Sequence, residues 1–128
     1  VVYAEDGMDE ISPEGRSHVF QITDGQVSER TVEASDFGLP AQKRSDLTAN
    51  TVEESIGLIR GVLEGKNSSN VEQAARTVVV MNTAAALVAV GQADTLQQGA
   101  EQAAESIESG RALAKLEALA ALSQELDG

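Results

Sequence analysis

The sequence predicts an α/β fold in which a short strand and a β-hairpin precede four helices. Residues 1–34 contain a run of alternating residues that ends at an Asp-Gly dipeptide, which is typical of a tight hairpin turn. Residues 51–128 carry apolar residues at helical spacing, and residues 35–50 form a polar connector. Three strands are too little sheet for a complete fold, so we interpret residues 1–128 as a single partial domain, the later half of a larger one.

The β-rich front begins with a strand over residues 1–3, which we expect to be buried. The hairpin follows, with strands over residues 17–23 and 26–34. The first of these places Phe20 and Ile22 on the same side, since alternate residues of a strand share a side. The intervening Asp-Gly supports a two-residue turn, because glycine accepts a positive φ.

The first predicted helix begins at Thr51, and Glu54 lies at the spacing of a capping box. Gly65 is placed to end it. We expect the apolar stripe of this helix to face the core; it consists of Val52, Ile56, Ile59, Val62 and Leu63.

The second predicted helix covers residues 71–90, with a cap at Asn70 and Gln73 and a stop at Gly91. Residues 78–81 are apolar all round, which predicts burial on several sides.

The third predicted helix begins at Thr95, with Gln98 three residues later, and ends at Gly110; its stripe is Leu96, Ala100, Ala103 and Ile107. The fourth covers residues 111–126. Its predicted inward face is Leu113, Leu116, Leu119 or Ala120, and Leu122.

The composition excludes several classes of function. The net charge of −12 disfavours nucleic acids and anionic membrane surfaces as partners, because positive charge supplies most of the affinity for both. No cysteine is present, which excludes disulfides and thiolate sites. The longest apolar stretch is too short to cross a membrane. We therefore expect a cytoplasmic, acidic domain with no nucleic-acid or membrane partner.

Two isolated polar residues stand out. His18 is the only histidine, and its position in an alternating strand favours a structural or solvent-exposed role over catalysis. Asn82 falls inside the most apolar helix, where a buried amide must have its hydrogen bonds satisfied. We expect Asn82 to tie a neighbouring loop, and we assign no catalytic residue.

The basic residues are few. Lys43 and Arg44 in the connector could hold an anion, although a solvated surface is the simpler interpretation. Arg76, Arg111 and Lys115 are expected to pair with acids three or four positions away on their own helices.

An acidic stretch directly follows the first strand. It contains Glu5, Asp6, Asp9 and Glu10, with Gly7 providing conformational freedom. Ligands of open α/β sheets bind outside the carboxyl ends of the strands, where such a loop would lie. Neighbouring carboxylates suit Mg²⁺, which takes one or two of them and completes its shell with water and phosphate. A solvated loop without a metal is the alternative.

Several stretches carry motifs in a defined order. They are Val2-Tyr3-Ala4…Gly7-Met8-Asp9-Glu10, Asp36-Phe37-Gly38-Leu39, RTVVVMNTAAALVAVG at residues 76–91, and Ala93-Asp94-Thr95-Leu96 followed by Glu105-Ser106-Ile107-Glu108-Ser109-Gly110. Together they resemble the C-terminal half of anthranilate phosphoribosyltransferase, where the first three read Val-His-Gly…Gly-Leu-Asp-Glu, Pro-Glu-Asp-Phe-Gly-Leu and Arg-Asp-x-Val-Leu-Leu-Asn-Ala-Ala-Ala-x-Leu. The implied fold is the C-terminal half of a nucleoside phosphorylase/phosphoribosyltransferase-like catalytic domain.

The resemblance implies transfer of phosphoribosyl from 5-phosphoribosyl-1-diphosphate to anthranilate, with release of diphosphate, in tryptophan biosynthesis. It implies that Asp9 and Glu10 bind Mg²⁺ against the diphosphate, whereas Glu5 and Asp6 are expected to be solvated neighbours. The family's phosphate-binding loop, its anthranilate-contacting arginine and the helical domain through which it dimerises belong to the N-terminal half. We therefore expect residues 1–128 alone to be inactive, and a homodimer at full length.

Two alternatives stay open. Tyr3-Ala4 replaces the family's His-Gly, which favours a non-catalytic binding or scaffold domain of the same fold. A nucleoside phosphorylase relative is the other.

Overall fold

The computed structural model describes residues 1–126. Its sheet has three antiparallel strands in the order β1-β2-β3: β1 is Val2–Ala4, β2 is Ser17–Thr23 and β3 is Gln26–Val32. The predicted hairpin is confirmed. Asp24 and Gly25 adopt φ values of 50° and 75°, the two positive angles that a tight hairpin turn requires.

The strand at the start of the chain is less buried than we expected. Ala4 is buried, but Tyr3 is 45% exposed and Val1 is 87% exposed. Tyr3 pairs in register with His18 and its ring stacks on the imidazole, on the sheet face that points away from the helices. Within residues 1–126 no element covers that face, so the prediction of a buried strand is wrong for these two residues.

Two short 3-10 helices connect the sheet to the helical part: η1 is Ala34–Phe37 and η2 is Arg44–Leu47. Strand β3 ends at Val32, two residues earlier than predicted, because Glu33 is the N-cap of η1 and Ala34 is its first residue. Phe37 at the end of η1 is only 1% exposed and anchors this connection in the core.

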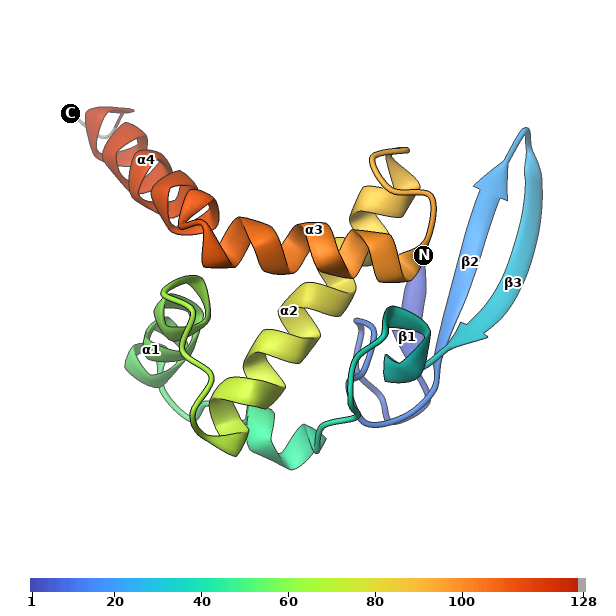
Figure 1. The fold of residues 1–128 in the computed structure, drawn as a ribbon, viewed down its shortest axis with the longest axis horizontal. Helices are drawn as coiled ribbons and strands as arrows, with labels where there is room; N and C mark the ends of the chain where they lie inside the picture. The colour runs from blue at the N-terminus through green and yellow to red at the C-terminus, as the bar shows by residue number, and fades with distance from the viewer. Residues whose placement is uncertain (127–128) are drawn as a thin grey trace.

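The helices are α1 Val52–Leu63, α2 Asn70–Ala89, α3 Leu96–Glu108 and α4 Arg111–Leu126. Helix α3 crosses α2, the sheet lies at one end of the molecule, and α4 lies at the other (Figure 1). The core forms where α2, α3 and η1 meet the sheet; its buried members include Ile11, Val32, Phe37, Val80, Met81, Ala84, Leu96, Ala100, Ala103 and Ile107. All four residues of the stripe predicted for α3 are buried.

The predicted N-caps of α1 and α3 are confirmed, but Glu54 and Gln98 accept from the residues before the caps, Asn50 and Asp94, so the reciprocal capping box predicted at Thr51 is not formed. Thr51 and Thr95 accept hydrogen bonds from the backbone N–H groups of the third helical residues, as predicted. On α2 the N-cap is Ser69, not Asn70, because Glu72 completes a capping box with Ser69. The predicted Asn70–Gln73 cap is therefore wrong by one position.

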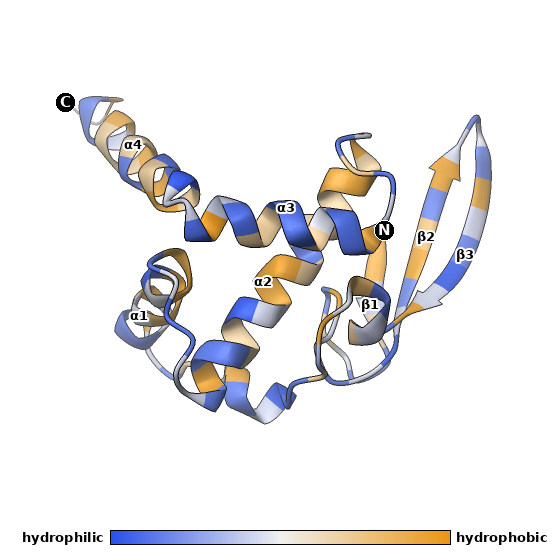
Figure 2. Ribbon diagram, in the orientation of Figure 1, coloured by the Kyte–Doolittle hydropathy of each residue, from blue (hydrophilic) through white to orange (hydrophobic). Residues whose placement is uncertain are grey.

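The burial predicted for three helical segments is corrected by the structure. On α1 only the C-terminal end is buried, against α2, while Val52, Ile56 and Ile59 are 49–69% exposed. On α4 no residue is buried, and apolar residues continue along a helix that extends away from the sheet (Figure 2). Residues 78–81 of α2 are not buried all round, since Val79 is 38% exposed.

No helix within residues 1–126 is long and apolar enough to cross a bilayer.

Candidate metal-binding loop

The acidic stretch forms a tight loop between β1 and Ile11, which we call the acidic loop (residues 5–10). The Ala4 N–H donates to the Met8 carbonyl at 2.9 Å, and the Gly7 N–H donates to the Ala4 carbonyl at 3.1 Å. Gly7 has a φ of 90°, a conformation that favours glycine. The Glu5 N–H donates to the Arg16 carbonyl at 3.0 Å, which joins the loop to the start of β2.

The Asp6 carboxylate organises this loop from within. It accepts hydrogen bonds from the Ser12 hydroxyl at 2.7 Å and from the Met8 N–H at 3.1 Å. The Ser12 hydrogen bond is the main cause that lowers the pKa of Asp6 below its ordinary value, with the Met8 N–H and the charge of Arg44 acting in the same direction. Asp6 is exposed, as expected of a solvated neighbour, but its carboxylate also has a structural role in the loop.

Arg44 braces the loop from the connector. Its guanidinium donates to the Asp6 carbonyl, and its backbone N–H donates to the Glu14 carboxylate at 2.9 Å. Arg44 is thus occupied by the protein itself and is not simply solvated surface.

Asn82 is half-buried and ties the far end of the loop, as expected. Its side-chain oxygen accepts from the Ile11 N–H at 2.9 Å, and its side-chain nitrogen donates to the Ile11 carbonyl at 3.1 Å. Ile11 and Ser12 are fully buried, and the Ser12 N–H donates to the Ser17 hydroxyl at 2.9 Å. The end of the loop is therefore part of the core.

Asp9 and Glu10 differ from the other two acids. Both are exposed, and within residues 1–126 no hydrogen bond or ion pair engages either carboxylate. Adjacent free carboxylates fit Mg²⁺, which needs only one or two from the protein. The described residues contain no cluster of three or more His, Cys, Asp or Glu that could hold a metal ion by themselves, so this pair leaves most of the coordination sphere to water and phosphate.

Glu5 belongs to a separate cluster on the outer face of the sheet. The His18 Nε2 lies 3.4 Å from the Glu5 carboxylate, and its Nδ1 lies 2.9 Å from that of Glu29. The ring of Tyr3 stacks on the imidazole with a centroid distance of 4.8 Å. His18 therefore has the structural role that its position in a strand predicted, and Tyr3 has a packing partner of its own.

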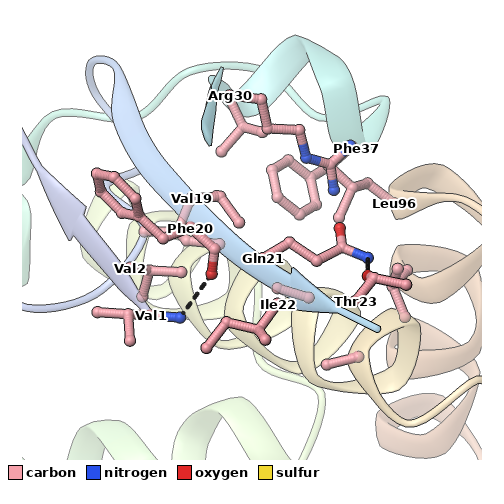
Figure 3. A pocket seen from close by; sticks show the side chains of 15 residues that line it. Val1, Val2, Val19, Phe20, Gln21, Ile22, Thr23, Arg30, Phe37 and Leu96 are labelled. Atoms are coloured by element: carbon pink, nitrogen blue, oxygen red, sulfur yellow. Dashed lines mark hydrogen bonds between the residues drawn. The ribbon is translucent and has the colours of Figure 1, made fainter. Parts of the chain in front are cut away.

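A separate cavity lies between the inner face of the sheet and α2. It has a volume of about 520 Å³, and its mainly apolar lining includes Val19, Val32 and Phe37, with Arg30 and Gln21 at its edge (Figure 3). None of residues 5–10 lines it, so it is distinct from the acidic loop.

Two helical arginines pair with acids of a neighbouring helix. Arg76 of α2 lies 2.7 Å from Glu108 of α3, and Arg111 of α4 lies 3.3 Å from Glu105 of α3. The prediction that these arginines pair three or four residues away is wrong, because the packing of α3 against α2 and the turn between α3 and α4 bring acids of α3 closer. Within residues 1–126, Lys115 makes no ion pair, so the prediction is wrong for it as well.

Sequence reasoning missed the roles of Asp6, Ser12 and Arg44. One local signal was available: Asp6-Gly7 is a turn-forming pair, since an aspartate readily accepts from the N–H two residues ahead. The sequence alone does not predict the contacts of Asp6 with Ser12 and Arg44, because they depend on how the chain folds back.

Comparison with known proteins identifies the family. Residues 1–113 match the model of the glycosyl transferase family, a/b domain. The chain belongs to this family. A relative within it, the anthranilate phosphoribosyltransferase of Methylococcus capsulatus, is 41% identical over 98% of this chain. The enzyme of the same name from Stutzerimonas stutzeri is 40% identical over 93%.

Solved structures of the same enzyme share the fold. The anthranilate phosphoribosyltransferase of Saccharomyces cerevisiae in complex with 4-fluoroanthranilate superimposes on this chain with a TM-score of 0.78. The match covers 91% of this chain at 31% sequence identity. The same yeast enzyme in complex with PRPP and Mg gives a TM-score of 0.77. The chain spans about a third of the length of the curated relatives and solved structures that it matches.

Proposed function

We propose that this chain is the magnesium-binding part of an enzyme that transfers phosphoribosyl from 5-phosphoribosyl-1-diphosphate to anthranilate and releases diphosphate, a step of tryptophan biosynthesis. Its family and the activity named for its relatives support this proposal. The neighbouring yeast structure in complex with PRPP and Mg supports the substrate and the ion.

One observation carries the assignment to particular residues. In a loop whose other polar groups are engaged, Asp9 and Glu10 are the two acids without an internal partner. An exposed carboxylate pair at the end of a sheet strand is available to a cation that is shared with a phosphate ligand.

The chemistry suits such a pair. When diphosphate leaves the C1 atom of the ribose, negative charge develops on the departing oxygens, and a bound Mg²⁺ supplies charge neutralisation there. Asp9 and Glu10 would hold the ion at the mouth of the loop, and the rigid loop would keep both carboxylates in place. No residue of this chain is required to form a covalent bond with the substrate.

Residues 1–128 supply only part of the proposed active site. The relatives are about three times as long as this chain, and we infer that their additional part supplies the groups that hold the ribose, the phosphates and anthranilate. Exposed apolar side chains on α1 and on the outer face of the sheet suit packing against such a part; they include Val52, Ile56, Ile59, Ile22 and Val27. A homodimer and a cytoplasmic location complete the proposal.

A chimera tests the function. This chain replaces the matching segment of the Methylococcus capsulatus relative, and activity is followed as loss of anthranilate in the presence of 5-phosphoribosyl-1-diphosphate and Mg²⁺. We expect an active chimera that loses activity on Asp9→Asn or Glu10→Gln and keeps it on Glu101→Gln, which changes an exposed carboxylate of α3.

The outcomes separate the alternatives. A folded chimera without activity would favour the non-catalytic domain, and an active chimera indifferent to Asp9 and Glu10 would refute the metal assignment. Residues 1–128 alone are expected to be inactive but to bind Mg²⁺ weakly with diphosphate, seen as amide chemical-shift changes at Asp9 and Glu10. Transferase activity of residues 1–128 alone would contradict the proposed division of the site.

A further inference from the structure

The side chain of Asn82 connects the middle of α2 to the end of the acidic loop. Its amide makes three hydrogen bonds: it accepts from the Ile11 N–H at 2.9 Å, and it donates to the carbonyls of Ile11 at 3.1 Å and Val78 at 2.9 Å. Because two bonds need N–H donors and one needs the oxygen, the amide can take only one orientation. Asn82 is therefore a fixed clamp on the Ile11 backbone.

This clamp acts directly on Glu10. The Ile11 N–H belongs to the planar peptide that also contains the Cα and carbonyl of Glu10. Ile11 itself is fully buried, so it has no freedom to turn. By holding that N–H, Asn82 fixes the plane from which the Glu10 side chain departs.

The other side of the carboxylate pair is fixed as well. The Met8 carbonyl accepts from the Ala4 N–H at 2.9 Å, which holds the peptide plane that leads into Asp9. The Asp6 carboxylate holds the Met8 N–H at 3.1 Å. Asp9 and Glu10 thus occupy a two-residue span between two fixed peptide planes.

We propose that Asn82 is a positioning residue for the cation: through the Glu10–Ile11 peptide it holds the carboxylates of Asp9 and Glu10 in the relative orientation that binds a divalent cation together with diphosphate. This inference rests on the proposed function. Asn82 does not touch the ion; it acts through Ile11, in the way that groups outside a metal's own ligands orient those ligands.

The test uses Mg²⁺ and inorganic diphosphate as probes and residues 1–128 as the protein. The amide shifts of Asp9 and Glu10 are followed during a Mg²⁺ titration at fixed diphosphate. The substitution Asn82→Asp preserves the shape and the acceptor but removes both donors. We expect it to weaken Mg²⁺ binding about 10-fold or more, the size of effect typical when such an outer partner is lost. The hydrogen exchange of the Ile11 amide should become faster in the same variant.

Two control variants separate this effect from charge and stability. Asn70→Asp makes the same chemical change in the exposed first turn of α2. Ile107→Ala removes a buried side chain of α3 and destabilises the core away from the loop. Both are expected to bind Mg²⁺ within about twofold of the unmodified chain. If Asn82→Asp does not fold, Asn82→Ser takes its place, because a serine hydroxyl can still bond the Val78 carbonyl one turn earlier but is too short to clamp Ile11.

The outcomes distinguish failure of the metal assignment from failure of the positioning role of Asn82. If the unmodified chain shows no Mg²⁺-dependent shift at Asp9 and Glu10, the metal assignment fails, and the role of Asn82 fails with it. If the unmodified chain responds and the Asn82 variant responds equally while its Ile11 amide exchanges faster, only the positioning role is overturned. Unchanged exchange at Ile11 would also overturn it, since the clamp would then not be what holds the loop.

Discussion

Helices α2 and α3 approach each other closely at Gly99, where they cross (Figure 1). A methyl group added to Gly99 would lie 2.8 Å from the Ala84 carbonyl oxygen and 2.9 Å from the Ala84 Cα. Both are backbone atoms of a helix, so neither can turn aside as a flexible side chain could. Gly57 in α1 is the matched case without this contact, because an added methyl group there meets no atom within 4 Å.

The two glycines predict opposite effects of the same substitution. Alanine in place of glycine inside a helix stabilises by about 1 kcal/mol, so Gly57→Ala should raise the free energy of unfolding by about 0.5–1 kcal/mol. At Gly99 this gain is opposed by overpacking, which costs about 1–3 kcal/mol, toward the upper end where backbone must move. We expect Gly99→Ala to lower the free energy of unfolding by about 1–2 kcal/mol.

Urea denaturation of residues 1–128, followed by far-ultraviolet circular dichroism, measures both variants. The difference between the two variants isolates the close contact, because the helix-propensity gain is common to both. This difference should be about 1.5–3 kcal/mol. If Gly99→Ala stabilises the chain as much as Gly57→Ala does, α2 and α3 do not approach as closely as the structure shows, and the reasoning is refuted.

Two further predictions concern the carboxylates. Because the Ser12 hydrogen bond lowers the pKa of Asp6, this carboxylate stabilises the fold at neutral pH, and its contribution is lost as the pH falls below the ordinary value of 3.8. Urea unfolding at pH 7 and pH 3 measures how much unfolding free energy each protein loses in acid. Asp6→Asn should lose less than the unmodified chain, by under about 1 kcal/mol because the side chain is exposed. An equal loss in both proteins would contradict this prediction. Asp36 accepts from the Glu33 N–H at 2.8 Å, so Asp36→Ala should lower the free energy of unfolding by about 1 kcal/mol and leave the Mg²⁺-dependent amide shifts intact. Asp9→Ala should abolish those shifts and lower the free energy of unfolding by less than about 0.5 kcal/mol. The reverse pattern would exchange the roles of the two residues.

Local signals predicted local structure well. The Asp-Gly turn and the Thr95 cap were predictable because the groups that satisfy them lie within a few residues. The cap of α2 was missed because two boxes with the same spacing compete one residue apart. Ser69 prevails because the Glu72 carboxylate accepts from the N–H groups of both Ser68 and Ser69, which also lowers its pKa.

Burial was less predictable than periodicity. The helical spacing of apolar residues on α1 and α4 was correct, and both helices are present. A stripe shows which face is suited to burial but not which element covers it. On α3 the stripe meets α2 and is buried, whereas Ile56 of α1 and Leu122 of α4 are about half exposed. Contacts between distant segments, such as Arg76 with Glu108, were missed for the same reason.

The motifs shared with the family divide by what their polar groups contact. In the Asp-Phe-Gly-Leu stretch, Asp36 satisfies a backbone N–H, Phe37 fills the core and Gly38 takes a positive φ, so folding alone accounts for the motif. In the acidic loop, Asp9 and Glu10 contribute nothing of this kind to the fold. A polar pair without partners inside the protein is more informative about function than a motif whose polar groups are already satisfied. This contrast cannot be seen in the sequence, and it selects the candidate metal site.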